Sequence, residues 1–240
     1  MKKPFNWERS LESEKEYWLR TKEWVCSQEW ADHMQNRTQW FVNWYSQTGE
    51  ITNATRIVHV GCGPDGEINF IKKGLRFAVD PLADFYREHF SEVLDPDVDF
   101  HAGRGEKIPF DSEFFDLAIS YNSLDHVEDP SAVLSEIRRV LKLGAILYLG
   151  IHVRSEYARF LHELSKHRRE IEDHYFHYSR RTLRQLVESQ AFTVLDERGE
   201  TEAERLSISR PAWMRSRVRR SLHALRGHSK RTWHVLAKKT

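Results

Sequence analysis

The sequence has little cysteine and no long apolar run. Only two of its 240 residues are cysteine, Cys26 and Cys62, which argues against a disulfide framework and against a zinc site built from cysteine alone. No apolar stretch approaches the ~20 residues of a membrane-spanning helix, and residues 1–8 lack the apolar core of a signal peptide. With 40% hydrophobic and 30% charged residues, the sequence predicts a globular, cytoplasmic protein with one domain and extensions.

Acidic residues are missing from the C-terminal end of the chain. Residues 205–240 hold eleven Lys or Arg and no Asp or Glu, although the net charge is only +1. We therefore expect a basic segment, 205–231, on an acidic body. Its part 210–231 fits an amphipathic helix that either covers the sheet edge or meets a peripheral anionic surface or substrate. The acidic body argues against nucleic acid as a partner.

A short apolar strand runs into a glycine-rich turn. Residues 56–60 read Arg-Ile-Val-His-Val, and the G-x-G-x-x-G pattern Gly61-Cys62-Gly63-Pro64-Asp65-Gly66 follows. Glycine lets the backbone turn tightly and come close to a ligand. We expect a helix over 65–73, with its N-terminus facing an anionic group. A second strand, 76–80, ends in Asp80, where a carboxylate can accept the two hydroxyls of a ribose.

Strands and helices alternate along the rest of the chain. Two helices are expected over 8–47, and later ones run from Pro130 to Gly144, over 155–172, and from a cap at Ser179 or Thr182. Further strands are expected at 98–103, 115–121, 145–151, 192–198 and 231–239. The pattern predicts an α/β fold: a doubly wound, seven-stranded, mostly parallel sheet with an N-terminal helical extension. The last two strands form a hairpin that places one antiparallel strand at the sheet edge.

The predicted domain organisation separates a helical cap from a ligand-binding domain. Residues 1–50 form the cap and residues 51–240 form the domain. Within the domain, residues 152–178 are an insert on the substrate side, followed by the basic segment. Ligands of doubly wound sheets bind at the carboxyl ends of the strands, and the glycine turn, Asp80 and His152 all fall at such ends.

Five segments in this order resemble the class I S-adenosylmethionine-dependent methyltransferases, in particular the branch that acts on small molecules. The resemblance covers 56–198, and the terminal hairpin extends it to the end of the chain. The segments are Val58–Pro64, Val79–Pro81, Gly103–Phe110, Phe115–Pro130 and Val140–Gly144. The resemblance implies S-adenosylmethionine as cofactor. It also implies methylation of a small-molecule acceptor, which we expect to be a sugar or glycan-pathway intermediate methylated at oxygen.

The resemblance assigns cofactor-binding roles to eleven residues. Gly61 and Gly63 would lie against the methionine part, Asp80 would hold the ribose hydroxyls, and the Tyr121 backbone would meet the methionine amine. The remaining residues are His59, Cys62, Pro81, Leu82, Gly105, Glu106 and Asn122. Two positions depart from the family pattern, because His59 stands where the family usually has an acid and Arg104 where it often has one.

Histidines are the candidate catalytic bases, because a base is needed when the acceptor is a hydroxyl that must lose its proton. His126 and His152 lead, since they follow the fourth and fifth strands. The substrate side would carry His174, His177, Trp40 and Trp44, although packing on the domain is the alternative role for these rings and the two roles are not exclusive. No metal site is expected from the histidine spacing.

Two other functions remain open at this point. The basic segment 205–231 would suit methylation of RNA or protein. The departures at His59 and Arg104 would suit a non-catalytic protein of the same fold that acts as a binding scaffold.

Overall fold

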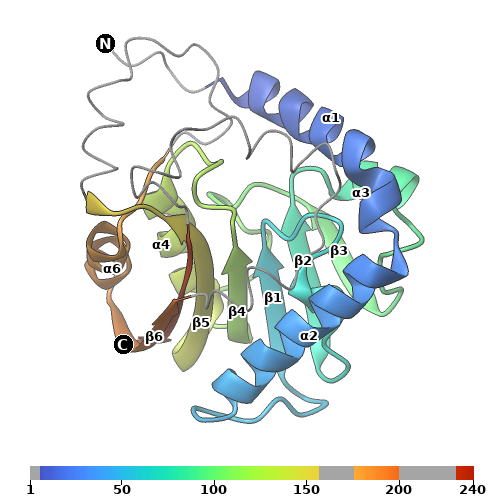
Figure 1. Ribbon diagram of the computed structural model, residues 1–240. Coiled ribbons are helices and arrows are strands. Elements are labelled where there is room, and N and C mark those ends of the chain that lie inside the picture. The colour runs from blue at the N-terminus through green and yellow to red at the C-terminus, as the bar shows by residue number, and fades with distance from the viewer. Residues whose placement is uncertain (1–5, 157–175, 200–230) are drawn as a thin grey trace.

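The computed structural model describes residues 6–156, 176–199 and 231–240, which build one sheet in the order β3-β2-β1-β4-β5-β7-β6 (Figure 1). Strands β1 to β5 are parallel, and β7 is antiparallel to both of its neighbours. The predicted seven-stranded, mostly parallel sheet is thus confirmed. The strands are β1 (Arg56–Val60), β2 (Leu75–Asp80), β3 (Val98–Ala102), β4 (Phe115–Tyr121), β5 (Leu141–Val153), β6 (Phe192–Gly199) and β7 (Arg231–Lys239).

Helices cover both faces of the sheet. In Figure 1, α2 crosses one face, and α4 lies on the opposite face. The chain enters the sheet at β1, moves outward to β3, and returns to β4 beside β1. This switch point between β1 and β4 is where doubly wound sheets bind their ligands. The helices are α1 (Trp7–Val25), α2 (Gln28–Tyr45), α3 (Ala83–His89), α4 (Pro130–Val140) and α6 (Arg180–Ser189).

Side-chain caps fix where these helices begin. The Asp129 carboxylate accepts the Ser131 and Ala132 N–H groups at the start of α4, with Pro130 as its first residue. At α6, Ser179 and Thr182 bond reciprocally in a capping box. Both helix starts were predicted from the sequence and are confirmed.

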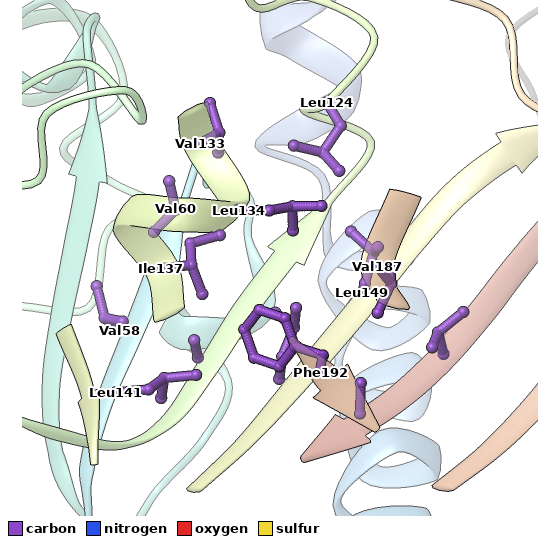
Figure 2. Packing of buried hydrophobic residues seen from close by; sticks show 14 of the residues in the cluster. Val58, Val60, Leu124, Val133, Leu134, Ile137, Leu141, Leu149, Val187 and Phe192 are labelled. Carbon is purple, nitrogen blue, oxygen red and sulfur yellow. The ribbon is translucent and has the colours of Figure 1, made fainter. Parts of the chain in front are cut away.

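Two apolar layers hold the helices to the sheet. Figure 2 shows Val133, Leu134 and Ile137 of α4 among the side chains of β1 and β5. On the other face, the Phe41 ring of α2 stacks on Tyr148 of β5 with their centroids 4.1 Å apart. Burial of each such side chain contributes roughly 1.5–3 kcal/mol to the free energy of folding. Both layers therefore hold in place the strands whose ends build the site.

The prediction of a helix over 65–73 is wrong. The structure has a single 3-10 turn there, η1 (Glu67–Asn69). The Asn69 side chain explains the difference, because its Nδ2 donates to the Pro64 carbonyl at 3.0 Å while its Oδ1 accepts the Asp95 N–H at 3.0 Å. A buried side chain that bonds backbone groups in this way favours a loop over a helix.

The end of α4 and the sheet edge also differ from expectation. Helix α4 ends at Val140 rather than at Gly144. The reason is that the carbonyls of Arg139 and Val140 accept the N–H groups of Glu113 and Phe114. Strand β7 lies inside the sheet and β6 forms its edge, which agrees with burial: β7 carries a continuous buried run, whereas β6 is mostly exposed or half-buried.

Some predictions concern residues outside the described part of the chain. They are the helix over 155–172, His174, and the basic segment up to residue 230. Among the helices that are described, none has both the length and the apolar character needed to cross a bilayer.

Candidate functional site

The glycine turn adopts a backbone that only glycine accommodates well. Gly61 and Gly63 have φ of 70° and 61°, a region that costs other residues free energy. A Cβ on Gly61 would lie 2.4 Å from the Ser123 Cβ, and one on Gly63 would lie 3.0 Å from the Trp18 ring. The turn therefore brings bare backbone to the carboxyl end of β1.

Asp80 joins the end of β2 to this turn. Its Oδ2 accepts the Gly63 N–H at 3.0 Å, and its Oδ1 accepts the Leu82 N–H at 2.9 Å. The side chain is 5% exposed. Burial raises the pKa of Asp80 to about 6, against the lowering effect of the two backbone bonds. The predicted ribose acid thus stands beside the predicted cofactor turn.

Helix α2 braces the turn from outside, a role that the sequence did not reveal. The Trp30 indole N–H donates to Asp65 Oδ2 at 2.8 Å, and Arg37 Nη2 lies 3.0 Å from Glu67 Oε1. Trp30 and Arg37 are seven residues apart, two helical turns, and therefore share one face. The only signal for these contacts in the sequence was the seven-residue spacing of Trp30 and Arg37, together with the acids Asp65 and Glu67 at the glycine turn.

His59 packs beneath the turn as a neutral ring. It is 1% exposed, and a Cβ on Gly66 would lie 2.8 Å from its Cε1. Burial lowers the pKa of His59 to about 4, so the ring is uncharged at pH 7. Its Nε2 lies 3.7 Å from Glu67 Oε2. A buried carboxylate therefore stands next to the position where the family pattern usually has an acid, although it comes from eight residues later.

The loop after β3 is held by its own ion pairs. Arg104 Nη2 lies 2.6 Å from Glu128 Oε2, and its guanidinium carbon lies 4.2 Å from the Trp7 ring centroid. Glu106 Oε1 accepts the Glu128 N–H at 3.0 Å, just before α4. A Cβ on Gly105 would lie 3.1 Å from Val133. A cavity of about 380 Å³ opens along this loop, lined by Arg104, Glu106, Lys107, Glu128, Asp129 and Ala132.

Polar side chains meet at the carboxyl ends of β4 and β5. Asn122 has φ of 49°, and its N–H donates to the Gly150 carbonyl at 2.8 Å. Its Nδ2 lies 3.5 Å from His152 Nε2, and His152 Nδ1 lies 3.2 Å from Thr232 Oγ1. Asn122 Oδ1 is buried without a hydrogen-bond partner among the described residues. This group offers both an acceptor and a histidine to a ligand.

His126, the other candidate base, has a different environment. Its Nδ1 lies 3.1 Å from Glu14 Oε1 of α1, and its Nε2 lies 3.8 Å from Asp125 Oδ1. His126 thus ties the loop after β4 to α1, whereas His152 belongs to the Asn122 group.

The remaining predicted residues are mainly packing positions. Trp44 is 1% exposed, and its indole N–H donates to Asp196 at 2.7 Å. The Trp40 ring lies 4.8 Å from His234 of β7. These contacts correspond to the packing interpretation of both tryptophans. His177 lines a separate cavity of about 350 Å³ beside the start of α4.

Three more of the predicted cofactor-binding residues, Cys62, Pro81 and Leu82, lie near the turn. Cys62 is buried, and burial raises the pKa of its thiol, so the thiol is neutral at pH 7. Leu82 packs with Tyr86 and Phe90, and Pro81 is half-buried. No group of three His, Cys, Asp or Glu side chains in the described ranges is placed to hold a metal ion.

The strand ends fit a ligand with a ribose and an amino-acid end. Gly61 and Gly63 present backbone without side chains, against which Ser123 and Trp18 pack closely, and Asp80 supplies a buried acceptor beside them. These are the features that close backbone approach and hydrogen bonding to such a ligand require.

Comparisons with known proteins find similarity to methyltransferases. A family model described as a methyltransferase domain matches residues 58–149. An uncharacterized methyltransferase of Schizosaccharomyces pombe is 32% identical over 107 residues, which are 39% of this chain and 38% of that protein. The match thus spans less than half the length of this relative.

Solved structures share the fold at low sequence identity. Geranyl diphosphate C-methyltransferase from Streptomyces coelicolor, in complex with S-adenosyl-L-homocysteine, has a TM-score of 0.64 and 17% identity over 85% of this chain and 79% of that one. Phosphoethanolamine N-methyltransferase 2 from Haemonchus contortus, in complex with S-adenosyl-L-methionine, has a TM-score of 0.60 and 17% identity over 85% of this chain and 52% of that one.

Proposed function

We propose that this chain, which belongs to the class I S-adenosylmethionine-dependent methyltransferases, methylates a hydroxyl oxygen of a small molecule such as a sugar or glycan-pathway intermediate. When bound, S-adenosylmethionine supplies an electrophilic methyl group on a positively charged sulfur. The observation that carries the proposal is the group formed by Asn122, His152 and Thr232, at the carboxyl ends of β4 and β5 and the start of β7.

The chain's own residues would bind the cofactor at the β1–β4 switch point. Asp80 would accept the ribose hydroxyls, and the glycine turn would lie against the amino-acid end. Tyr121 and Asn122 lie at the end of β4, next to the switch point. Orienting the two reactants in line is the main contribution of an enzyme to a displacement of this kind.

His152 would remove the proton of the acceptor. In the tautomer that suits this role, Nδ1–H donates to Thr232 Oγ1, and Nε2 accepts from the hydroxyl. Asn122 lies 3.5 Å from the same Nε2, and its unused Oδ1 would orient the acceptor by accepting a second hydrogen bond. Histidine suits this role because it titrates near neutral pH.

A His152→Ala variant is expected to lose roughly 10²- to 10⁴-fold in kcat, the usual contribution of a general base, with unchanged affinity for S-adenosylhomocysteine. Turnover would be followed as S-adenosylhomocysteine release with a panel of sugars and other small hydroxyl compounds. His101→Ala, on the half-buried end of β3, is the matched control and should keep full activity.

Other outcomes of the same assay would contradict the proposal. Turnover with RNA or protein but with no small hydroxyl compound would favour the alternative based on the basic segment. An equal loss of cofactor affinity and kcat in His152→Ala would assign His152 to cofactor binding instead of base catalysis.

Affinity for S-adenosylhomocysteine is expected to fall with decreasing pH below about 6, approaching tenfold per pH unit. The pKa of Asp80 is raised to about 6 by burial, so the carboxylate is ionised above this pH and protonated below it. The protonated acid has lost the charge that strengthens bonds from the ribose hydroxyls. Calorimetry between pH 5 and pH 8 measures the effect. The pKa of Asp65 is also about 6, and the same decline in Asp80→Asn would assign it to Asp65.

A further inference from the structure

Arg37 reaches from α2 to the end of the sheet where the glycine turn lies. Its Nη2 is 3.0 Å from Glu67 Oε1, just after the turn. Its guanidinium carbon is 4.2 Å from the centroid of the Tyr121 ring, at the end of β4. The guanidinium therefore lies between the turn after β1 and the end of β4, the two segments that flank the switch point.

The guanidinium has an unused hydrogen-bond donor at this position. The side chain of Arg37 is 20% exposed, but its Nε–H is buried and has no hydrogen-bond partner among the described residues. A buried donor left unpaired is destabilising, because it has lost its bonds to water without gaining a partner. The contacts with Glu67 and Tyr121 fix the plane of the guanidinium without using Nε, so a ligand that offers an anionic oxygen would complete its bonding.

The surroundings of Arg37 are otherwise acidic or neutral. Glu67 is fully buried, and Asp65 lies close enough to interact electrostatically with Arg37. His59 is neutral because burial lowers its pKa to about 4. A ligand carboxylate entering this corner would meet repulsion from both acids unless a cation received it, and Arg37 is placed to do so.

We propose that Arg37 binds the carboxylate at the methionine end of the cofactor, with Glu67 and Tyr121 holding its guanidinium in place. This proposal rests on the proposed function, because it concerns the cofactor of that reaction. Arginine is suited to the role, since its planar fork of N–H donors matches a carboxylate and stays charged at all relevant pH values. Tyr121, whose backbone would meet the methionine amine, thus places both charged ends of the amino acid at one residue.

The test compares two ligands that differ only in the carboxylate. They are S-adenosylhomocysteine and its decarboxylated analogue, which keeps the amine. In the wild type, calorimetry should show roughly 10- to 100-fold weaker binding of the analogue, as expected for one charged hydrogen-bonded pair. In Arg37→Met, which keeps a long side chain over Tyr121, affinity for S-adenosylhomocysteine should fall to that of the analogue. The two ligands would then bind equally.

Two further variants keep the test decisive. Arg37→Lys keeps the charge without the fork and should show an intermediate preference, even if Arg37→Met proves unstable beside the buried Glu67. Arg184→Ala removes a half-exposed cation of α6 and should leave both affinities unchanged. Equal losses for both ligands in Arg37→Met and Arg37→Lys would overturn carboxylate binding and leave Arg37 as a brace of the turn. A wild type that binds neither ligand would overturn the proposed function itself.

Discussion

Asp80→Ala is expected to weaken binding of S-adenosylhomocysteine about 100-fold. The ionised carboxylate would accept two ribose hydroxyls, and charge-assisted bonds of this kind contribute about 1.5–3 kcal/mol each. The loss of about 3 kcal/mol corresponds to two orders of magnitude in Kd. The variant should also unfold at a lower temperature, because the N–H groups of Gly63 and Leu82 lose the acceptor that pairs them. Calorimetric titration and thermal unfolding measure the two effects separately.

Asp80→Asn separates ligand binding from the support of the turn. The amide keeps one acceptor oxygen for a backbone N–H, so stability should largely return, whereas the negative charge that favours the ribose hydroxyls stays absent. Asp99→Ala, an exposed acid of β3, should change neither quantity. Full affinity in Asp80→Ala would contradict the ribose role. Full recovery of affinity in Asp80→Asn would show that the residue acts only through the turn.

The sheet was predictable because local patterns decide it. Each parallel strand is a short apolar run, and Asp129-Pro130 and Ser179 mark helix starts by capping chemistry within four residues. The position of β7 was not predictable in the same way. Hairpin geometry alone allows β6 or β7 to pair with β5, and burial of Val235, Leu236 and Ala237 selects β7.

The support of the turn depends on contacts that no local pattern encodes. Trp30 meets Asp65 across 35 residues, and Arg37 meets Glu67 across 30. Once these contacts are known, the departures at His59 and Arg104 have a physical account. His59 is a neutral ring under the turn beside the Glu67 carboxylate, and Arg104 is paired with Glu106 and Glu128. Arg104 is therefore part of an ion-pair network, whereas His59 is a buried neutral ring packed beside the Glu67 carboxylate. Each departure thus has a structural role, so neither by itself favours a non-catalytic scaffold.

The residues proposed to bind the methyl acceptor could also be predicted only in part from the sequence. His152 and Asn122 follow strands that the sequence identifies, but Thr232 joins them only through the antiparallel register in which it pairs with His152. Histidine position alone could not separate His152 from His126, since both follow a strand. Their positions separate them: His126 contacts Glu14 of α1, whereas His152 lies beside Asn122 and Thr232.

Gly61→Ala is expected to abolish measurable binding of S-adenosylhomocysteine while the sheet remains folded. The residue has φ of 70°, which costs an alanine about 1–2 kcal/mol. The larger effect is steric, because the new Cβ would lie 2.4 Å from the Ser123 Cβ and 3.0 Å from its Oγ. The turn or the loop after β4 must move to relieve this contact. Either movement shifts backbone that would contact the cofactor, so calorimetry should detect no binding while circular dichroism shows the native fold.

Two variants separate the collision from the backbone strain. Gly144→Ala places an alanine at φ of 79°, but its Cβ would meet only the end of the Lys238 side chain at 3.5 Å. It should therefore lose stability without losing affinity. Ser123→Gly removes the Cβ and Oγ that the new methyl group would strike, and its addition to Gly61→Ala should restore much of the binding. If the double variant binds no better than Gly61→Ala, strain in the turn rather than contact with Ser123 accounts for the requirement for glycine. If Gly61→Ala keeps full affinity, the cofactor does not depend on this turn.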